Sequence, residues 1–240
     1  MIYEINSDAL ILSDSHSQYN RMKLIKVLQN LNPIPSQIIL LGDVLNLLIG
    51  SIKSSRKQNQ YALQVLEELS KKTKILYLEG NHDFNLNPIL KNAIKIKRGV
   101  QPIICRFKCK YLLLAHGDIF LGKKYEIYAK VMRSFGFLLL LKIIDFLSFG
   151  KVYEYISKKV QNKIIKTPDA RKANLVMQKR IIAYEKYMKK KNIEVNYVIE
   201  GHFHIKEKMK RRGREKDFLY IAMPPYLYDK KIYTLNELMD

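Results

Sequence analysis

The segment Ile75-Leu76-Tyr77-Leu78-Glu79-Gly80-Asn81-His82-Asp83 joins an apolar run to a turn that carries chemically capable side chains. The apolar part is typical of a buried strand. Strand ends in layered α/β folds are where ligand sites are built, so the residues from Gly80 to Asp83 form a candidate site. Taken alone, this segment also fits an ordinary turn, since Gly, Asn and Asp are favoured turn formers.

The same arrangement recurs at four other places in the chain. A short apolar run is followed each time by Asp or His, in Ser13-Asp14-Ser15-His16, Gly42-Asp43, His116-Gly117-Asp118 and Gly201-His202-Phe203-His204. The chain has five His, and all of them lie at these strand exits. Structural His would be scattered along the chain, so the pattern predicts a metal site. Residues two apart in an extended segment point to the same side, which pairs Asp14 with His16 and His202 with His204.

The chemical types of these side chains indicate the kind of metal. Carboxylate, imidazole and amide oxygen ligands suit a divalent ion such as Mn²⁺, whereas structural zinc favours thiolates. The set is larger than one tetrahedral ion needs, so we expect two ions that share a bridging carboxylate. Two ions about 3.5–4 Å apart can hold both the attacking and the leaving oxygen at phosphorus. The residues therefore predict a metal-dependent hydrolase of phosphate esters.

In their order, the five blocks resemble the motifs of the calcineurin-like metallophosphoesterases, from Asp14 to His204. The resemblance implies an α/β fold, a four-layer sandwich of two mixed β-sheets flanked by helices. It also implies that one ion is held by Asp14, His16, Asp43 and His204, and the other by Asp43, Asn81, His116 and His202. Two positions depart from the family pattern: Asn46 stands where an acidic residue is frequent, and Phe203 where a small residue is usual.

His82 is the candidate catalytic residue that is not a predicted ligand. It could donate a hydrogen bond to the phosphoryl oxygens or protonate the leaving group, with Asp83 fixing its tautomer. The alternative is that His82 only shapes the loop that holds Asn81. Asp118 is expected to be a hydrogen-bond partner of His116.

The composition is that of a globular protein, with 48% hydrophobic residues in 240. This length is enough for one substantial core and does not require a second domain. The net charge of +21 indicates a polyanionic partner: nucleic acid, an anionic membrane surface or a phosphorylated substrate. Having only two cysteines, Cys105 and Cys109, is typical of a reducing compartment. We see no signal peptide before the first strand, and so expect a cytoplasmic protein.

Residues 123–191 differ in character from the rest of the chain. They hold eighteen Lys and Arg against five Asp and Glu, and so supply +13 of the net charge of +21. The segment is predicted to be helical, with breaks near Gly136, Gly150 and Thr167-Pro168. We interpret it as a helical cap inserted in one catalytic core that comprises 1–122 and 192–240. Arg171 and Lys172 are candidate phosphate contacts from this cap.

The cap contains the apolar run Phe135–Leu147. The run is too short, and too interrupted by charge, to span a membrane. It can be a core helix. It can also be an interfacial helix that dips into a leaflet while the surrounding Lys and Arg bind anionic headgroups. Both interpretations stay open on the sequence.

A basic, helical and apolar insertion at this place is similar to that of the UDP-2,3-diacylglucosamine hydrolases of lipid A synthesis. The resemblance implies a peripheral enzyme on the inner face of the membrane. Its substrate would be a lipid-linked nucleotide sugar, cleaved at the pyrophosphate bond to UMP and a phosphorylated lipid sugar. That branch commonly has Arg at the position of His82 and an acidic pair near Lys123-Lys124, so the chain departs from it at both places.

Two other functions compete with this one. A phosphodiesterase or nuclease of the same superfamily could use the basic cap to bind phosphate backbones. The leucines of Phe135–Leu147 argue against nucleic acid, whose binding grooves interleave basic residues with aromatic ones. A non-catalytic scaffold could keep the fold and bind partners, but the full set of ligands argues against this alternative.

Overall fold

The strand that precedes Asn81 is β5 (Lys74–Leu78), and its apolar side chains are buried. It belongs to a five-stranded sheet with the order β13-β2-β3-β5-β7. Four of these strands are parallel, and β13 is antiparallel to β2. The other strands of this sheet are β2 (Leu10–Leu12), β3 (Gln37–Leu40), β7 (Ile94–Ile96) and β13 (Tyr233–Thr234). Because parallel strands end at the same edge, the segments that follow β2, β3 and β5 meet there.

A second sheet of six strands has the order β1-β8-β9-β10-β12-β11. Its strands are β1 (Ile2–Ile5), β8 (Ile103–Phe107), β9 (Lys110–Ala115), β10 (Tyr197–Glu200), β11 (Glu207–Arg211) and β12 (Phe218–Ala222). Strands β8 and β9 form an antiparallel hairpin, while β9 and β10 are parallel neighbours. The segments that begin at His116 and Gly201 therefore leave the sheet side by side.

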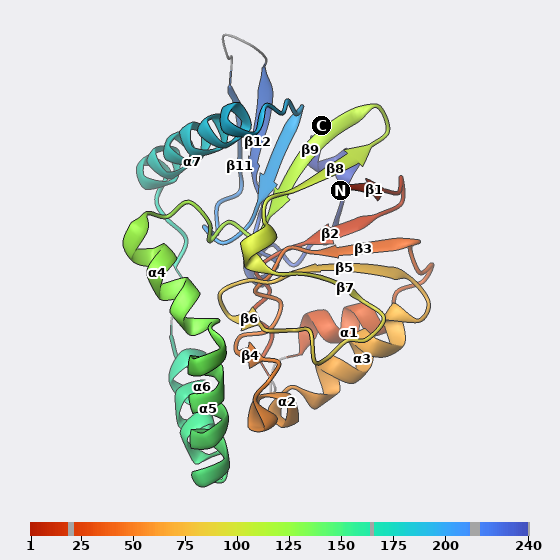
Figure 1. Cartoon of the computed structure of the whole chain (residues 1–240). Helices are drawn as coiled ribbons and strands as arrows, with labels where there is room; N and C mark the ends of the chain where they lie inside the picture. The colour runs from red at the N-terminus through yellow and green to blue at the C-terminus, as the bar shows by residue number, and fades with distance from the viewer. Residues whose placement is uncertain (19–21, 164–165, 212–216, 240) are drawn as a thin grey trace.

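The two sheets face each other across the main core, and helices cover their outer faces (Figure 1). This computed structural model describes residues 1–18, 22–163, 166–211 and 217–239. Helices α1 (Lys23–Gln29) and α3 (Gln60–Ser70) pack on the five-stranded sheet, and α3 does so through a stripe with helical spacing, from Ala62 to Leu69. Helix α7 (Ala170–Lys191) packs Met177, Ile181 and Tyr184 on the six-stranded sheet. The predicted α/β fold, with mixed sheets flanked by helices, is confirmed.

Short elements complete the core. They are β4 (Leu48–Ile49) and β6 (Asp83–Phe84), which pair with each other, α2 (Lys53–Gln58), the 3-10 helix η1 (Arg98–Val100), α8 (Tyr226–Asp229) and α9 (Leu235–Met239). The β4–β6 pair matters for the site, because it holds the loop after Asp43 beside the loop that contains His82.

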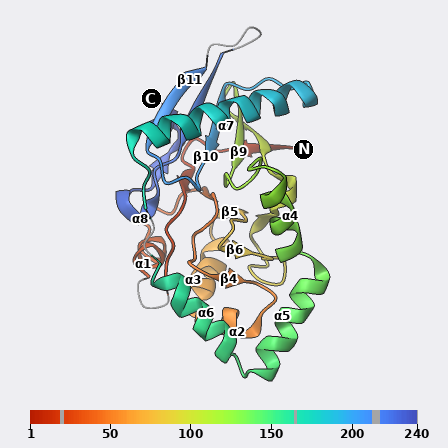
Figure 2. The same cartoon turned by 90° about the vertical axis from the view of Figure 1, so that its left-hand side faces the viewer.

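In the described part of the predicted insertion 123–191 there are four helices: α4 (Lys123–Met132), α5 (Phe135–Leu147), α6 (Lys151–Gln161) and α7. Figure 2 looks onto the edge where the strands end and shows α4, α5 and α6 curving around it below α7. Since α7 forms the outer layer of a sheet, the helices that cap this edge are α4 to α6. The break predicted near Gly136 lies just before α5, where Ser134 caps the helix by accepting a hydrogen bond from the N–H of Phe137.

Helix α5 is the apolar run, and most of it faces solvent. Phe135 and Phe146 are 82% and 79% exposed, whereas Leu138 and Asp145 are buried. The interpretation of the run as a core helix is therefore wrong for most of its length. The buried carboxylate has a structural task, because Asp145 Oδ2 accepts a hydrogen bond from the N–H of Ser54 in the first turn of α2. None of the helices in the described ranges has the length and hydropathy needed to cross a bilayer.

Candidate metal centre

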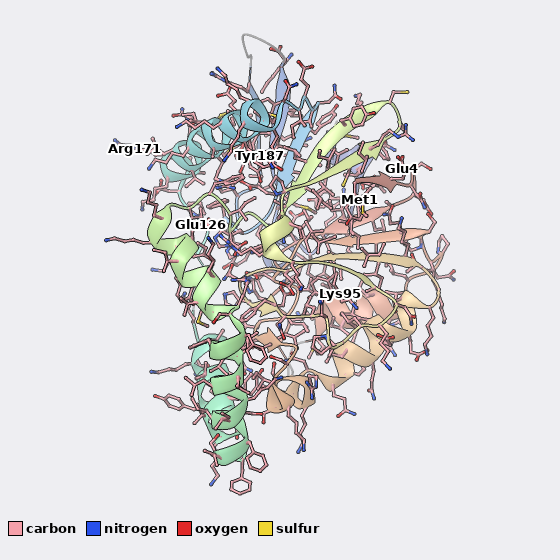
Figure 3. The ribbon with its side chains drawn as sticks, in the orientation of Figure 1. Met1, Glu4, Lys95, Glu126, Arg171 and Tyr187 are labelled. Carbon is pink, nitrogen blue, oxygen red and sulfur yellow. The ribbon has the colours of Figure 1, made fainter. Side chains whose placement is uncertain are left out.

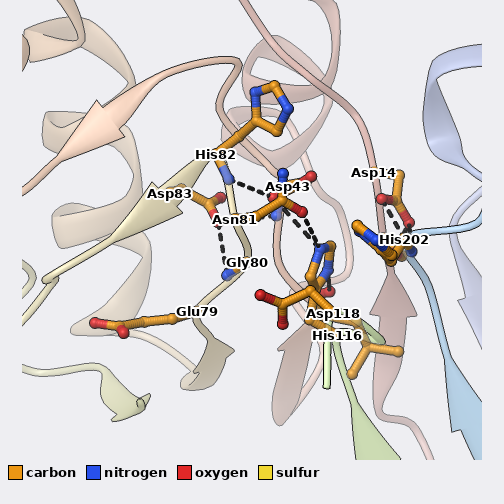
Figure 4. A network of polar contacts seen from close by, with 12 residues as sticks. Asp14, Asp43, Glu79, Gly80, Asn81, His82, Asp83, His116, Asp118 and His202 are labelled. Carbon is orange, nitrogen blue, oxygen red and sulfur yellow. Dashed lines mark hydrogen bonds and ion pairs between the residues drawn. The ribbon is translucent and has the colours of Figure 1, made fainter. Parts of the chain in front are cut away.

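The predicted ligands meet at the edge where the two sheets end, and Figure 4 shows five of them: Asp14, Asp43, Asn81, His116 and His202. Three groups of side chains have ligand atoms within 4.8 Å of one another: Asp14, His16 and His204; Asp43, His116 and His202; and His16, Asp43 and His82. The Oδ1 of Asn81 lies 3.2 Å from His116 Nε2, so the amide belongs with the second group. All seven predicted ligands are thus close together, although their binding to metal remains a prediction.

Asp43 lies between the first two groups. Its Oδ2 is 3.8 Å from His16 Nε2, and its Oδ1 is 3.5 Å from His116 Nε2. On the first side, His16 Nε2 and His204 Nε2 are 3.3 Å apart, so two imidazole nitrogens converge on one point. Converging nitrogen and oxygen donors on both sides of one carboxylate fit two divalent ions, and Asp43 lies where the predicted bridging ligand would be.

The backbone at five of the seven predicted ligands is left-handed rather than extended. The φ angles of Asp14, His16, Asp43, His202 and His204 are 50°, 44°, 51°, 68° and 53°. Strands β2 and β10 end before these residues, so alternation in an extended segment does not apply to them. Asp14 and His16 lie in one group as predicted, whereas the predicted pairing of His202 with His204 is wrong, because the two lie in different groups. Such φ values are uncommon for residues other than Gly, and each costs about 1–3 kcal/mol. The surrounding hydrogen bonds must hold these turns in place.

Two glycines allow the turns to approach each other. A Cβ atom at Gly80 would overlap the carboxylate of Asp43, and one at Gly201 would overlap Ser13 and the carboxylate of Asp14. The N–H of His202 donates to Asp14 Oδ2 at 2.9 Å, which joins the turn after β10 to the turn after β2. These close contacts explain why Gly precedes the ligand-bearing residue in both loops.

Asp83 anchors the turn that carries Asp43. Its buried carboxylate accepts hydrogen bonds from the N–H groups of Asp43 and Val44 at 2.8 and 2.7 Å, and from the Tyr77 hydroxyl at 2.6 Å. Within the described chain, the partner of His82 Nδ1 is the carbonyl of Asn46, at 2.6 Å. The expectation that Asp83 fixes the tautomer of His82 is therefore wrong. His82 precedes β6, and the Asp83 carboxylate is engaged by the turn of Asp43 and by Tyr77 instead.

His116 is oriented by the main chain rather than by Asp118. Its Nδ1 lies 2.7 Å from the carbonyl oxygen of Leu41, a group that can only accept, so Nδ1 donates and Nε2 faces Asp43. Asp118 instead accepts a hydrogen bond from Arg98 Nε at 2.9 Å. The predicted hydrogen bond between Asp118 and His116 is thus replaced by a carbonyl contact, which is also a common way to orient a metal-binding His.

The site favours neutral imidazoles and charged carboxylates at most positions. Burial lowers the pKa of His16 and of His202 to about 4 each. Burial would raise the pKa of Asp43, but His116 and His82 outweigh it and hold that pKa below its usual range. Burial would likewise lower the pKa of His116, yet Asp43 and Asp14 raise it to about 9. Metal binding at His116 needs the neutral imidazole and so competes with its protonation.

Phe203, which departs from the family pattern, fills the space between the site and α7. Its ring centroid lies 5.0 Å from that of His202, and the guanidinium of Arg180 lies 5.2 Å over its other side. Arg180 in turn makes two hydrogen bonds of 2.7 Å with the buried carboxylate of Glu200, which also accepts from the hydroxyl of Tyr184. The larger residue thus packs the His202 turn against a buried ion pair.

The structure does not bring Arg171 and Lys172 to the metal centre. Both are exposed in the first turn of α7, and Figure 3 shows Arg171 at the outer end of that helix. Lys172 pairs with Asp169, the residue that caps the helix, at 3.1 Å. A basic residue of the insertion that does reach the site is Arg133, whose Nη2 donates to the carbonyl of Gly80 at 2.8 Å. Sequence reasoning missed it, because nothing in the sequence distinguishes it from the other basic residues of the cap.

An apolar pocket opens beside Asn81 and His82. Its volume is about 410 Å³, and it extends between α5 and α6. Its aliphatic lining includes Ile49, Ile52, Leu141, Ile144, Val152 and Val160, with Phe84, Tyr128 and Tyr153 among the aromatic residues. The hydroxyl of Tyr153 donates to the carbonyl of Leu47 and so ties α6 to the loop after Asp43. The site therefore combines a polar metal centre with a pocket suited to an aliphatic group.

A comparison with known proteins shows the family of the chain. Residues 9–206 match the family model described as calcineurin-like phosphoesterase. No curated protein matches the chain. Among solved structures, a protein of unknown function from Aquifex aeolicus is 16% identical, with 98% of each chain covered and a TM-score of 0.48. An archaeal phosphodiesterase is 13% identical over 96% of this chain and 94% of its own, with a TM-score of 0.40. A nuclease from Pseudomonas putida is 21% identical over 44% of this chain and 53% of its own, with a TM-score of 0.30. Because the family match extends from before Asp14 to beyond His204, the chain belongs to the calcineurin-like phosphoesterases, which are metal-dependent hydrolases of phosphate esters.

Proposed function

We propose that the protein hydrolyses the diphosphate bond of a lipid-linked nucleotide sugar of the UDP-diacylglucosamine type, giving UMP and a phosphorylated lipid sugar. The observation that carries the proposal is the apolar pocket of about 410 Å³ that opens beside Asn81 and His82. Aliphatic walls favour a hydrocarbon chain, because they remove part of its surface from water. A phosphate ester held at the metal centre would therefore place an attached acyl chain in this pocket.

In this proposal two Mn²⁺ ions occupy the centre. One is held by Asp14, His16, Asp43 and His204, the other by Asp43, Asn81, His116 and His202. When bound, such ions stabilise negative charge at phosphorus and lower the pKa of water. His82 lies at the mouth of the pocket with Nδ1 donating to the Asn46 carbonyl. Its Nε2 can therefore donate to a phosphoryl or leaving oxygen only as the imidazolium, and the neutral ring can only accept a proton there.

We further propose that α5 attaches the protein to the cytoplasmic face of an anionic membrane. Besides Phe135 and Phe146, the exposed residues include Leu147 at 69% and Phe149 at 91%. The same insertion supplies +13 of the net charge of +21. Apolar side chains that enter a leaflet and lysines that bind its headgroups act together in peripheral attachment. A substrate with acyl chains would be met at that surface.

The competing activity is that of a phosphodiesterase or nuclease, with nucleic acid as the polyanionic partner. The pocket is lined mainly by aliphatic side chains, whereas bases bind by stacking on aromatic ones. The test is Mn²⁺-dependent turnover of four substrates: a UDP-diacylglucosamine, a cyclic nucleotide, a phosphopeptide and single-stranded DNA. We expect the highest kcat/KM for the first, with UMP as a product. A higher kcat/KM for the DNA or the cyclic nucleotide would refute the proposal.

A further inference from the structure

Two guanidinium groups meet at the buried carboxylate of Asp118, two residues after His116. Arg98 Nε donates to Asp118 Oδ2 at 2.9 Å, and Arg98 Nη2 donates to the main-chain carbonyl of Asp118 at 2.6 Å. Arg133 Nη2 lies 3.6 Å from the same Oδ2. Because Asp118 has no exposed surface, water does not solvate its carboxylate, and the two arginines compensate for this. One carboxylate next to the metal centre thus holds both arginines.

The two arginines come from opposite sides of the boundary between core and cap. Arg98, in η1, reaches into the first turn of α4, where its Nη1 and Nη2 each donate to Glu126 at 2.9 Å. Arg133 follows the last residue of α4 and reaches back to the core. There it donates to the carbonyl of Gly80, and its guanidinium lies 4.9 Å over the ring of Phe84. Both ends of α4 are therefore tied to the core beside the metal centre.

The contact between Arg133 and Gly80 joins two residues whose sequence neighbours line the apolar pocket. Met132, which precedes Arg133, lines that pocket, and so does Asn81, which follows Gly80. In each of the pairs Met132-Arg133 and Gly80-Asn81, one residue thus lines the pocket and the other takes part in the hydrogen bond. Tyr128, one turn earlier in α4, lines the pocket as well. A displacement of α4 by a bound ligand would be transmitted through this hydrogen bond.

We propose that Arg133 is a positioning residue that couples a chain bound in the pocket to the placement of Asn81. The inference rests on the proposed function, since it requires the pocket to hold an aliphatic chain. A chain that presses on Met132 shifts Arg133, and with it the Gly80 carbonyl. A misplacement of about 1 Å at a reacting centre can change a rate about 100-fold, so a small shift has a measurable effect.

The kinetic test uses methyl p-nitrophenyl phosphate and decyl p-nitrophenyl phosphate with Mn²⁺. We expect the wild-type protein to hydrolyse the decyl ester with the higher kcat. In Arg133→Gln the kcat for the decyl ester should fall about 3- to 30-fold, toward that of the methyl ester, as is typical when a coupling residue is changed. The KM for the decyl ester should stay within about twofold, because Arg133 does not line the pocket. Arg133→Lys keeps a charged donor and should recover part of the difference. Lys130→Gln, an exposed position on the same helix, is the control and should resemble the wild type.

A second readout does not depend on turnover. Coupling between two ligands is reciprocal, so decyl phosphonate should tighten binding of the second Mn²⁺ equivalent about 3- to 30-fold relative to methyl phosphonate. Electron paramagnetic resonance of free Mn²⁺ measures this difference, and we expect Arg133→Gln to lose it. An equal fall in kcat for both esters would show that Arg133 only supports the fold, and so would overturn the coupling. An unchanged decyl advantage in the variant would overturn the coupling alone. Equal kcat/KM for the two esters in the wild-type protein would overturn the proposed function and the coupling with it.

Discussion

Replacing Leu139 and Leu140 with Asp should release the protein from anionic vesicles without unfolding it. The two side chains are 45% and 49% exposed, so little of the core depends on them. Complete burial of a Leu contributes about 1.5–3 kcal/mol, and two half-exposed side chains that enter a leaflet therefore supply about 2 kcal/mol. Each Asp adds about 1 kcal/mol of repulsion from an anionic surface. The sum of about 4 kcal/mol corresponds to about a thousandfold weaker partitioning.

Sedimentation with sucrose-loaded vesicles of phosphatidylglycerol and phosphatidylcholine measures this partitioning. The matched control carries Leu175→Asp and Ile182→Asp in α7, at side chains that are 50% and 49% exposed. It has the same charge as the test variant and should still sediment. Hydrolysis of a small soluble phosphodiester should survive in both proteins, because the predicted ligands lie outside the cap. A test variant that keeps its circular dichroism and its thermal transition but sediments like the wild type would refute the attachment by α5.

Three further predictions concern the centre and its supports. His202→Ala should bind one Mn²⁺ fewer, as measured by atomic absorption, and its kcat should fall at least about 100-fold. The reason is that even residues that only hydrogen-bond to metal ligands contribute about 10–100-fold to activity. Unchanged turnover by a fully metal-loaded variant would contradict this prediction. Arg180→Met should lower the free energy of unfolding in urea by about 3–5 kcal/mol, because it leaves the Glu200 carboxylate buried without its partner; a loss well below this range would mean that the ion pair is dispensable. The hydrogen bonds from Arg98 lower the pKa of Glu126 below 4.5, so its stabilisation is complete above that pH and is lost as the pH falls through the lowered value. The difference in unfolding free energy between the wild type and Glu126→Gln should therefore shrink between neutral and acid pH, and a difference that is constant with pH would exclude this ion pair as its source.

The members of the metal centre could be predicted because each directly follows a strand. Asp14, Asp43 and Asn81 come from neighbouring parallel strands, and these end at one edge whatever the details of packing. The orientation of the ligands could not be predicted, because His16 and His204 lie in left-handed turns. Such turns are held by contacts with other turns. The alternation of side chains within one segment carries no information about those contacts.

The supporting residues were harder to predict for the same reason. Asp83 bonds to the N–H of Asp43, which lies forty residues earlier, and so only the folded chain shows its role. Asp118 was assigned to the nearest His in sequence, yet its partners are Arg98 and Arg133, both more than ten residues away. A charged residue near a ligand is a good candidate for a supporting role, but its partner depends on how the loops and the cap pack.

Helix α5 presents one face to solvent and the other to the pocket. Leu139 and Ile143 are 45% and 47% exposed, while Leu141 and Ile144 line the pocket. An α-helix with its side chains is about 10–12 Å across, so on the proposed function an acyl chain that leaves a bilayer at the outer face has only about this distance to travel. Each CH₂ that crosses water on the way costs about 0.8 kcal/mol, which makes a short path favourable for a long chain. Exposed apolar surface of this kind would promote aggregation of a freely diffusing hydrolase. On the proposed function it would instead contact the bilayer from which the acyl chain passes into the pocket.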